Sequence, residues 1–225
     1  MTIEKEKVIP LDEPSSDQSL IQGVYGKYRI TKDDEIEVQR YRISILICGI
    51  SFCGGIFHWL FFGPSLAWLW LIAMTVGLGL ALKWIHIYLR PLHRALQILW
   101  AIGCLGFGIL FINVGGQNLL SSLASKPIWT IAIGPLFAAL TGIGFKEFFC
   151  FRRLEAIGLT ILVPLALLGH LIGVLQPGLV MILLICSAIL LLVLSIRKFG
   201  MDAAADVGDK SVFNYLDRQQ TAEAL

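Results

Sequence analysis

The sequence predicts an all-α, polytopic membrane protein with six transmembrane helices, arranged as three hairpins, and with both termini in the cytoplasm. Its 225 residues have a mean hydropathy of +0.77, and only 15% are charged, whereas soluble proteins have about 25%. A helix of about 20 residues spans the roughly 30 Å hydrocarbon core of a bilayer. Apolar residues gather in six segments of this length, at 43–62, 66–86, 95–114, 128–145, 156–174 and 179–196. Because these segments are apolar on all sides, they are expected to be helices and not barrel strands.

The distribution of basic residues predicts the orientation of these helices. Of the 18 Lys and Arg residues, 17 lie before residue 43, after residue 196 and in the connections at 83–94 and 146–155. The connections at 63–65, 115–127 and 175–178 contain one in total, Lys126. Basic residues are retained on the cytoplasmic side of a membrane. Both termini and the two basic connections are therefore expected in the cytoplasm.

The first element is a helix that begins before the first apolar segment. Thr31 and Asp34 have the spacing of a capping box, and the acidic residues nearby suit the positive end of a helix dipole. We expect the helix to run from about Lys32 into the first span, with Tyr41 at the membrane interface. Residues 1–30 are expected to form a flexible cytoplasmic tail.

Prolines mark the beginnings of the later elements. Pro64, Pro127 and Pro177 stand near the starts of the second, fourth and sixth spans, and Pro91 near the start of the third. Proline in the first turn of a helix loses no helical hydrogen bond. Residues 31–198 are therefore expected to form the membrane domain, with a short surface helix between residues 114 and 127. Residues 199–225 are assigned to a cytoplasmic tail.

The two basic connections contain a candidate cytoplasmic-face cluster. Two carboxylates beside several cations and two histidines would form a binding site if the connections met. The alternative is that these are solvated interfacial charges, including Lys146 beside Glu147. The candidate residues are Lys83, His86, Arg90, His93, Glu147, Arg153 and Glu155.

No catalytic residue is assigned. The spacing of Lys83, Arg90 and Pro91 matches the first motif of the lipid-phosphatase (PAP2) superfamily. Phosphoryl transfer by that superfamily also needs a histidine nucleophile and a proton donor. The sequence contains neither of the motifs that supply these groups, so the match is interpreted as coincidental.

Two histidines are candidates for binding a cofactor inside the membrane. His58 and His170 lie within apolar spans at similar depths, and ionisable residues there are functional candidates. They would bind a haem or a pigment if they were neighbours; the alternative is interhelical hydrogen bonding. The five cysteines lack the spacing of a metal site, so no metal is assigned and the cofactor stays unknown.

Small residues and prolines within the spans indicate helix packing and helix bends. Gly134, Ala138 and Gly142 form a small-residue stripe on the fourth span, which would let another backbone approach closely. Pro135 and Pro164 are expected to bend the fourth and fifth spans, and such bends line transport sites in some transporters.

Three stretches carry a family resemblance: "VYGKYRIT", "KWIHIYLRPLHRALQ" and "GFKEFFCFRRLE". Together they resemble an uncharacterised integral membrane protein family of cyanobacteria, with relatives in other bacteria and in plants. The resemblance covers about residues 23–198 and implies a class of protein without an activity.

The expected function is that of a non-enzymatic integral membrane protein, which would help to assemble or stabilise a membrane complex. One alternative is a transporter or channel for a small neutral solute, and another is a haem- or pigment-binding protein. The expected partners are the lipid bilayer and other membrane proteins, in a plasma or thylakoid membrane. Nucleic acid is not expected, because the basic residues do not form one stripe.

Overall fold

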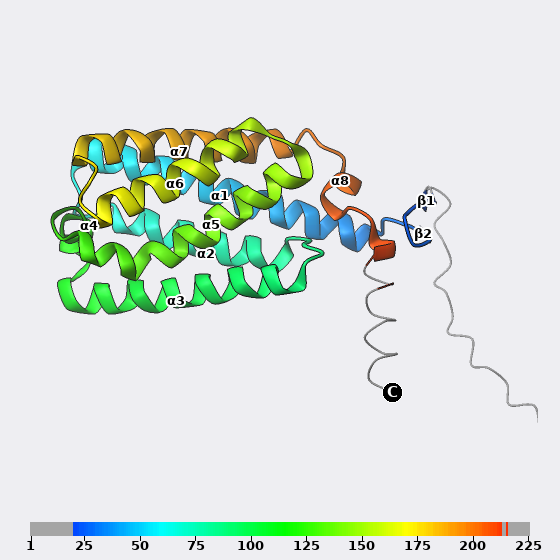
Figure 1. Cartoon of the computed structure of the whole chain (residues 1–225), viewed down its shortest axis with the longest axis horizontal. Helices are drawn as coiled ribbons and strands as arrows, with labels where there is room; N and C mark the ends of the chain where they lie inside the picture. Colours follow the sequence, from blue (N-terminus) through cyan, green and yellow to red (C-terminus); the bar gives the residue numbers. More distant parts are fainter. Residues whose placement is uncertain (1–19, 213–214, 216–225) are drawn as a thin grey trace, which may run out of the picture.

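The computed structural model describes residues 20–212 and 215, which form six long helices and several short elements (Figure 1). The elements are β1 (Ile21–Gln22), β2 (Lys27–Tyr28), α1 (Lys32–Phe62), α2 (Trp68–Trp84), α3 (Arg90–Val114), α4 (Gly116–Ser125), the 3-10 helix η1 (Pro127–Trp129), α5 (Thr130–Phe151), α6 (Leu154–Leu171), α7 (Pro177–Lys198) and α8 (Ala203–Val207).

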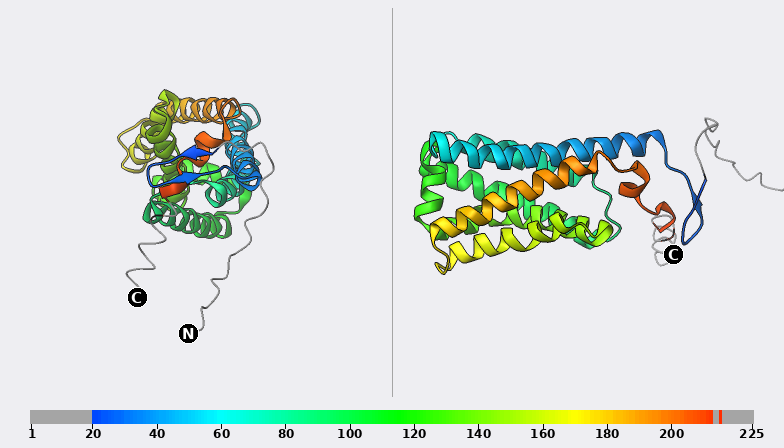
Figure 2. Two further views of the ribbon diagram at one scale, coloured as in Figure 1. Left: turned by 90° about the vertical axis from the view of Figure 1, so that its right-hand side faces the viewer. Right: turned by 90° about the horizontal axis from the view of Figure 1, so that it is seen from above.

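The six long helices pack as a closed ring. Each contacts two neighbours, in the order α1, α2, α3, α5, α6, α7 and back to α1. The ring is seen end-on in Figure 2. We call the end that holds the starts of α3 and α6 and the ends of α2, α5 and α7 the basic end. At the opposite end, α4 lies across the bundle (Figure 1), and its Leu119 and Leu123 are buried.

Five of the long helices have the length and composition needed to cross a membrane: α1, α3, η1 with α5, α6 and α7. The sixth, α2, is equally apolar but has 17 residues. Large apolar side chains such as Leu105, Ile112 and Ile182 are exposed on the outer face of the ring. A surface of this kind suits contact with lipid and would be unfavourable in water. Each expected apolar segment corresponds to one long helix.

The capping box at the start of α1 is confirmed. The Thr31 hydroxyl accepts a hydrogen bond from the Asp34 backbone N–H at 3.3 Å, and Asp34 Oδ2 accepts one from the Thr31 N–H at 2.6 Å. These bonds satisfy donors that a helix start leaves without a partner. Helix α1 therefore begins at Lys32, well before its apolar part, and projects beyond the other helices at the basic end (Figure 1).

Both segments assigned to tails contain ordered elements. Strands β1 and β2 pair antiparallel, with Ile21 opposite Tyr28, and α8 follows α7 after a short connection. Residues 1–19, 213–214 and 216–225 of the tail assignments lie outside the described residues. The hairpin and α8 lie together at the basic end (Figures 1 and 2).

Candidate functional site

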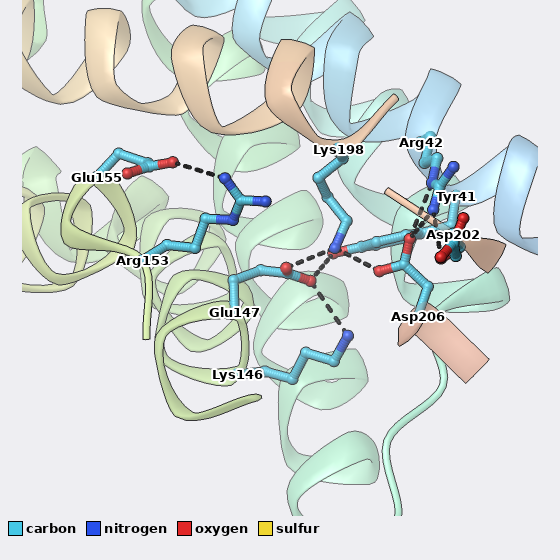
Figure 3. A network of polar contacts seen from close by, with 9 residues as sticks. All are labelled: Tyr41, Arg42, Lys146, Glu147, Arg153, Glu155, Lys198, Asp202 and Asp206. Carbon is cyan, nitrogen blue, oxygen red and sulfur yellow. Dashed lines mark hydrogen bonds and ion pairs between the residues drawn. The ribbon is translucent and has the colours of Figure 1, made fainter. Parts of the chain in front are cut away.

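A network of buried charged side chains joins four helices at the basic end (Figure 3). At its centre, Lys198 Nζ lies 2.5 Å from Glu147 Oε2 and 2.5 Å from Asp206 Oδ1. The side chains of Lys198 and Glu147 are each 1% exposed. A buried charge is stable only when it is paired, so Lys198 links the end of α7 to both α5 and α8.

Three hydrogen bonds tie α1 to this part of the structure. Arg42 Nε donates a hydrogen bond to Asp206 Oδ2 at 2.8 Å, and its Nη2 donates to the Asp202 carbonyl at 3.1 Å. The Tyr41 hydroxyl donates to Glu147 Oε1 at 2.7 Å. The basic-end network thus consists of Tyr41, Arg42, Lys146, Glu147, Lys198 and Asp206.

Aromatic rings complete the surroundings of the cations. Lys146 Nζ lies 3.1 Å from Glu147 Oε1, and the network holds three cations against two carboxylates. Lys198 Nζ lies 4.5 Å from the centre of the Phe151 ring, and Lys146 Nζ lies 5.5 Å from that of Tyr41. The negative faces of these rings stabilise the excess positive charge.

The interpretation of Lys146 and Glu147 as solvated charges is wrong, since their exposed fractions are 7% and 1%. Tyr41, expected at the membrane interface, is 2% exposed and lies inside the protein. Its ring packs among the cations while its hydroxyl reaches Glu147. The aromatic side chain at this depth therefore belongs to the network and does not face lipid.

A second ion cluster joins the start of α6 to the end of α7. Glu155 Oε1 lies 2.9 Å from Arg197 Nη1 and 3.6 Å from Arg153 Nη1, and its side chain is 7% exposed. Arg152, between α5 and α6, has a φ of 51° in the left-handed region. This tight turn reverses the chain and places the Glu155 cluster beside the network (Figure 3).

The residues of the expected cytoplasmic-face cluster are found in three places. Glu147 lies in the basic-end network, and Arg153 and Glu155 form the second cluster. The other four, Lys83, His86, Arg90 and His93, lie at the end of α2, in the connection to α3 and in the first turn of α3.

His86 and His93, at the connection between α2 and α3, contact different partners. His86 Nε2 lies 3.3 Å from Glu37 Oε2. Burial lowers the pKa of His86, and the nearby Glu37 carboxylate opposes part of this effect. His93 Nε2 lies 2.7 Å from the Leu82 carbonyl oxygen and ties the start of α3 to the end of α2. These contacts secure the connection between the two helices.

Asp209 and Ser211 join the end of the described chain to the β-hairpin formed by β1 and β2. Asp209 Oδ2 accepts a hydrogen bond from the Val24 N–H at 2.7 Å, and Ser211 Oγ accepts one from the Tyr25 N–H at 3.0 Å. The Tyr25 ring stacks on that of Tyr215, with centroids 4.1 Å apart. We call residues 20–31, 203–212 and 215 the terminal platform.

The platform is also bonded to α1. Lys210 Nζ lies 2.7 Å from Asp34 Oδ2 in the first turn of that helix. Hydrogen bonds donated by the Ser211 hydroxyl and the Val24 N–H lower the pKa of Asp209, because they stabilise its carboxylate. Asp209 is therefore ionised at neutral pH and acts as an acceptor between the two ends of the described chain.

The two candidate intramembrane histidines line different cavities. His170 borders a cavity of about 230 Å³ inside the ring. Its Nε2 lies 2.9 Å from the Leu123 carbonyl oxygen on α4. His58 lines a separate groove together with Phe62 and Trp70. Within the described residues, no group of three or more His, Cys, Asp or Glu side chains has an arrangement that would hold a metal ion.

The apolar helices, their lipid-suited outer face and the concentration of charges at one end, with Lys126 the exception among the described residues, define the class of integral membrane proteins. Comparison with known families agrees with this class. The chain belongs to the family described as "Uncharacterized integral membrane protein (DUF2301)", whose model matches residues 80–215. This range includes Glu147, Lys198 and Asp206 but not α1.

A protein of Haemophilus influenzae, described as "Uncharacterized protein", is 32% identical over 133 residues. The matched region is 57% of this chain and 66% of the relative. No solved structure matches the chain. The family membership supports the membrane class that the composition predicts, and neither description names an activity.

Proposed function

We propose that the chain crosses the membrane six times as three hairpins, with the basic end and both termini in the cytoplasm. The support is the confinement of 17 of the 18 Lys and Arg residues to the segments before residue 43 and after residue 196 and to the two basic connections. The membrane would be the plasma membrane, or a thylakoid membrane if the source is cyanobacterial.

Cysteine labelling of intact cells tests this topology. In a background without the native cysteines, Lys126→Cys is expected to react with a membrane-impermeant maleimide. Arg90→Cys and Arg153→Cys are expected to react only after permeabilisation, because charged reagents do not cross the hydrocarbon core. Labelling of the residue 90 and residue 153 sites from opposite sides would exclude the six-span arrangement.

We propose that the protein has a non-enzymatic role in the assembly or stability of a membrane complex. The observation that carries this proposal is the terminal platform, which presents exposed apolar side chains beyond the basic end of the bundle. Val24 is 79% exposed and Tyr25 is 54% exposed. Exposed apolar groups outside the membrane commonly mark contacts with other proteins. The platform would therefore dock a partner protein at the cytoplasmic face.

The pairing of the buried acids supports the same role. In the described part of the chain, Glu147, Glu155 and Asp206 each contact a cation within the protein. Their charges hold helices together, whereas a general acid or base needs a proton position open to substrate.

Releasing the platform is expected to remove the protein from any larger complex. Asp209→Ala removes the acceptor of the Val24 N–H, so native gels of mildly solubilised membranes should show loss of the higher-mass species. Trypsin should also cleave after Lys27 several-fold faster, because the hairpin is freed. Asp33→Ala, an exposed acid in the first turn of α1, is the matched control and should change neither result.

A wild-type protein that migrates only at its own size, together with solute flux in reconstituted vesicles, would contradict this proposal. It would favour the second candidate, a transporter, for which the ring of helices around a cavity is the supporting observation. The cavity borders α5 and α6, the two helices with an internal proline, but its wall is apolar, which disfavours a polar solute.

An absorption spectrum of the purified protein tests the third candidate, a bound haem or pigment.

A further inference from the structure

The ring of helices encloses a cavity next to α4, at the end of the bundle opposite the basic end. Residues of α1, α2, α4, α5, α6 and α7 line it, so every long helix except α3 contributes. Phe52 and Phe137, whose ring centroids lie 5.7 Å apart, contact each other at the side of the cavity nearer the basic end. Leu120 and Leu123 of α4 cover the other side. The cavity is therefore a chamber with a defined floor and roof.

The size of this chamber is unusual for a packed interior. Its volume is about 230 Å³, whereas protein cores contain few voids larger than a water molecule. An engineered apolar cavity of about 150 Å³ stays dry and binds benzene. The chamber is therefore large enough for a molecule of about two fused rings.

The wall of the chamber is apolar except at three places. Trp59, Trp70 and the two phenylalanines provide aromatic faces, and the polar side chains of the wall are Ser51, Thr130 and His170. Water needs two to four polar partners to occupy such a space. A wall of this composition favours an apolar ligand that carries few polar atoms.

His170 gives the chamber a defined hydrogen-bonding character. Its Nε2 lies 2.9 Å from the Leu123 carbonyl oxygen, and a carbonyl oxygen can only accept, so Nε2 carries the proton. In a neutral imidazole the other nitrogen, Nδ1, is then an acceptor without a proton. The unprotonated Nδ1 is therefore the nitrogen of this ring that can accept a hydrogen bond.

The chamber also reaches the surface of the protein. Two residues of its wall, Ala124 at the end of α4 and Pro177 at the start of α7, are exposed. Both lie at the end of the bundle away from the basic end. This opening provides an entrance for a ligand without disruption of the basic-end network.

We propose that the chamber binds a small apolar ring compound with one hydroxyl group, which donates its hydrogen bond to His170 Nδ1. The rings would occupy the aromatic part of the wall, and the hydroxyl would be the only polar group to be satisfied. This site does not depend on the terminal platform, so its test is independent of the test of the proposed role in a complex.

Binding of 2-naphthol to the full chain in lipid nanodiscs tests the proposal, with 2-methoxynaphthalene as the ligand that lacks the donor. Equilibrium dialysis against nanodiscs without protein corrects for partition into lipid. We expect saturable binding of 2-naphthol and about 3- to 10-fold weaker binding of 2-methoxynaphthalene, which is the range for one neutral hydrogen bond. Binding no greater than that of empty nanodiscs, or equal binding of the two compounds, would overturn the proposal.

Three variants locate the site. Ala124→Trp places a large ring in the chamber and should weaken binding of both compounds at least about tenfold, since the volume is filled. Ser121→Trp, on the same helix but outside the wall, should bind as the wild type does. His170→Phe should bind both compounds with the same affinity. Unchanged 2-naphthol binding by Ala124→Trp would overturn the assignment to this chamber.

A further variant separates recognition from folding, because the His170 bond to Leu123 also ties α6 to α4. His170→Gln retains both a donor for the carbonyl and an acceptor for the ligand. It should therefore keep the preference for 2-naphthol that His170→Phe loses. Retention of the preference for 2-naphthol by His170→Phe, with a melting temperature equal to that of the wild type, would rule out acceptance by the residue 170 side chain.

Discussion

Replacement of Lys198 by methionine is expected to lower the free energy of unfolding by about 3–5 kcal/mol, the range for breaking a buried ion pair. The substitution keeps the aliphatic bulk but leaves Glu147 and Asp206 without the cation that lies 2.5 Å from each. Two carboxylates would then lie close together at a buried position, where their repulsion is weakly screened. Thermal unfolding of the purified protein in detergent measures this loss.

The control for Lys198 is an exposed lysine at the other end of the bundle. Lys126→Met should change the free energy of unfolding by no more than about 0.5 kcal/mol, as is usual at exposed sites. In Lys198→Met, the two carboxylates still contact Lys146 and Arg42, respectively. Adding Glu147→Gln to Lys198→Met should recover part of the loss, because it removes the repulsion between the two carboxylates. Equal effects of the two lysine substitutions would show that Lys198 contributes no more to the free energy of unfolding than an exposed lysine does.

Substitution of Gly106 by alanine is expected to destabilise the packing of α3 on α5 by about 1–3 kcal/mol, the usual cost of overpacking. A Cβ added at Gly106 would lie 2.0 Å from the Ala132 carbonyl oxygen and 2.8 Å from its carbonyl carbon. The obstacle is backbone, so no side-chain rotation relieves it. The two helices would have to separate, and the melting temperature should fall.

Gly108 on the same helix provides a matched comparison. A Cβ at this position meets nothing within 4 Å, so Gly108→Ala gains helix propensity without a clash. It should be neutral or stabilising by up to about 1 kcal/mol. The same chemical change, two residues apart, should thus have opposite signs, and a similar fall for both variants would contradict the close approach of α3 and α5.

The apolar segments were sufficient to predict the long helices, because the length of a span is set by the bilayer and not by its partners. The start of α1 was equally predictable, since the capping box of Thr31 and Asp34 is a local interaction. Both inferences need only neighbouring residues. The expected surface helix between the third and fourth spans also appears, as α4.

The basic-end network could not be predicted in the same way. Glu147 pairs with Lys198 across 51 positions of the sequence, and Arg42 with Asp206 across 164. Asp206 lies in α8, whose five residues are too few for a recognisable helical pattern. The signal that was available, an acid and a lysine adjacent in sequence at 146–147, was compatible with solvation as well as with burial.

The glycines that allow two helices to approach closely were also not predictable from the sequence. The sequence directed attention to Gly134 and Gly142 on α5. A Cβ at Gly134 meets nothing within 4 Å, whereas the closest backbone approach is made by Gly103 and Gly106 on α3. Small residues make a close approach possible, but the sequence does not say which helix faces them.

The pairing of Arg42 with Asp206 has a consequence for biosynthesis. Helix α1 contains an arginine, Arg42, whose carboxylate partner is translated 164 residues later. A nascent or truncated chain that stops before residue 206 therefore lacks the carboxylate partner of Arg42, whereas Lys198 can still pair with Glu147. The packing of α1 at the basic end therefore depends on a segment that is translated only after all six long helices.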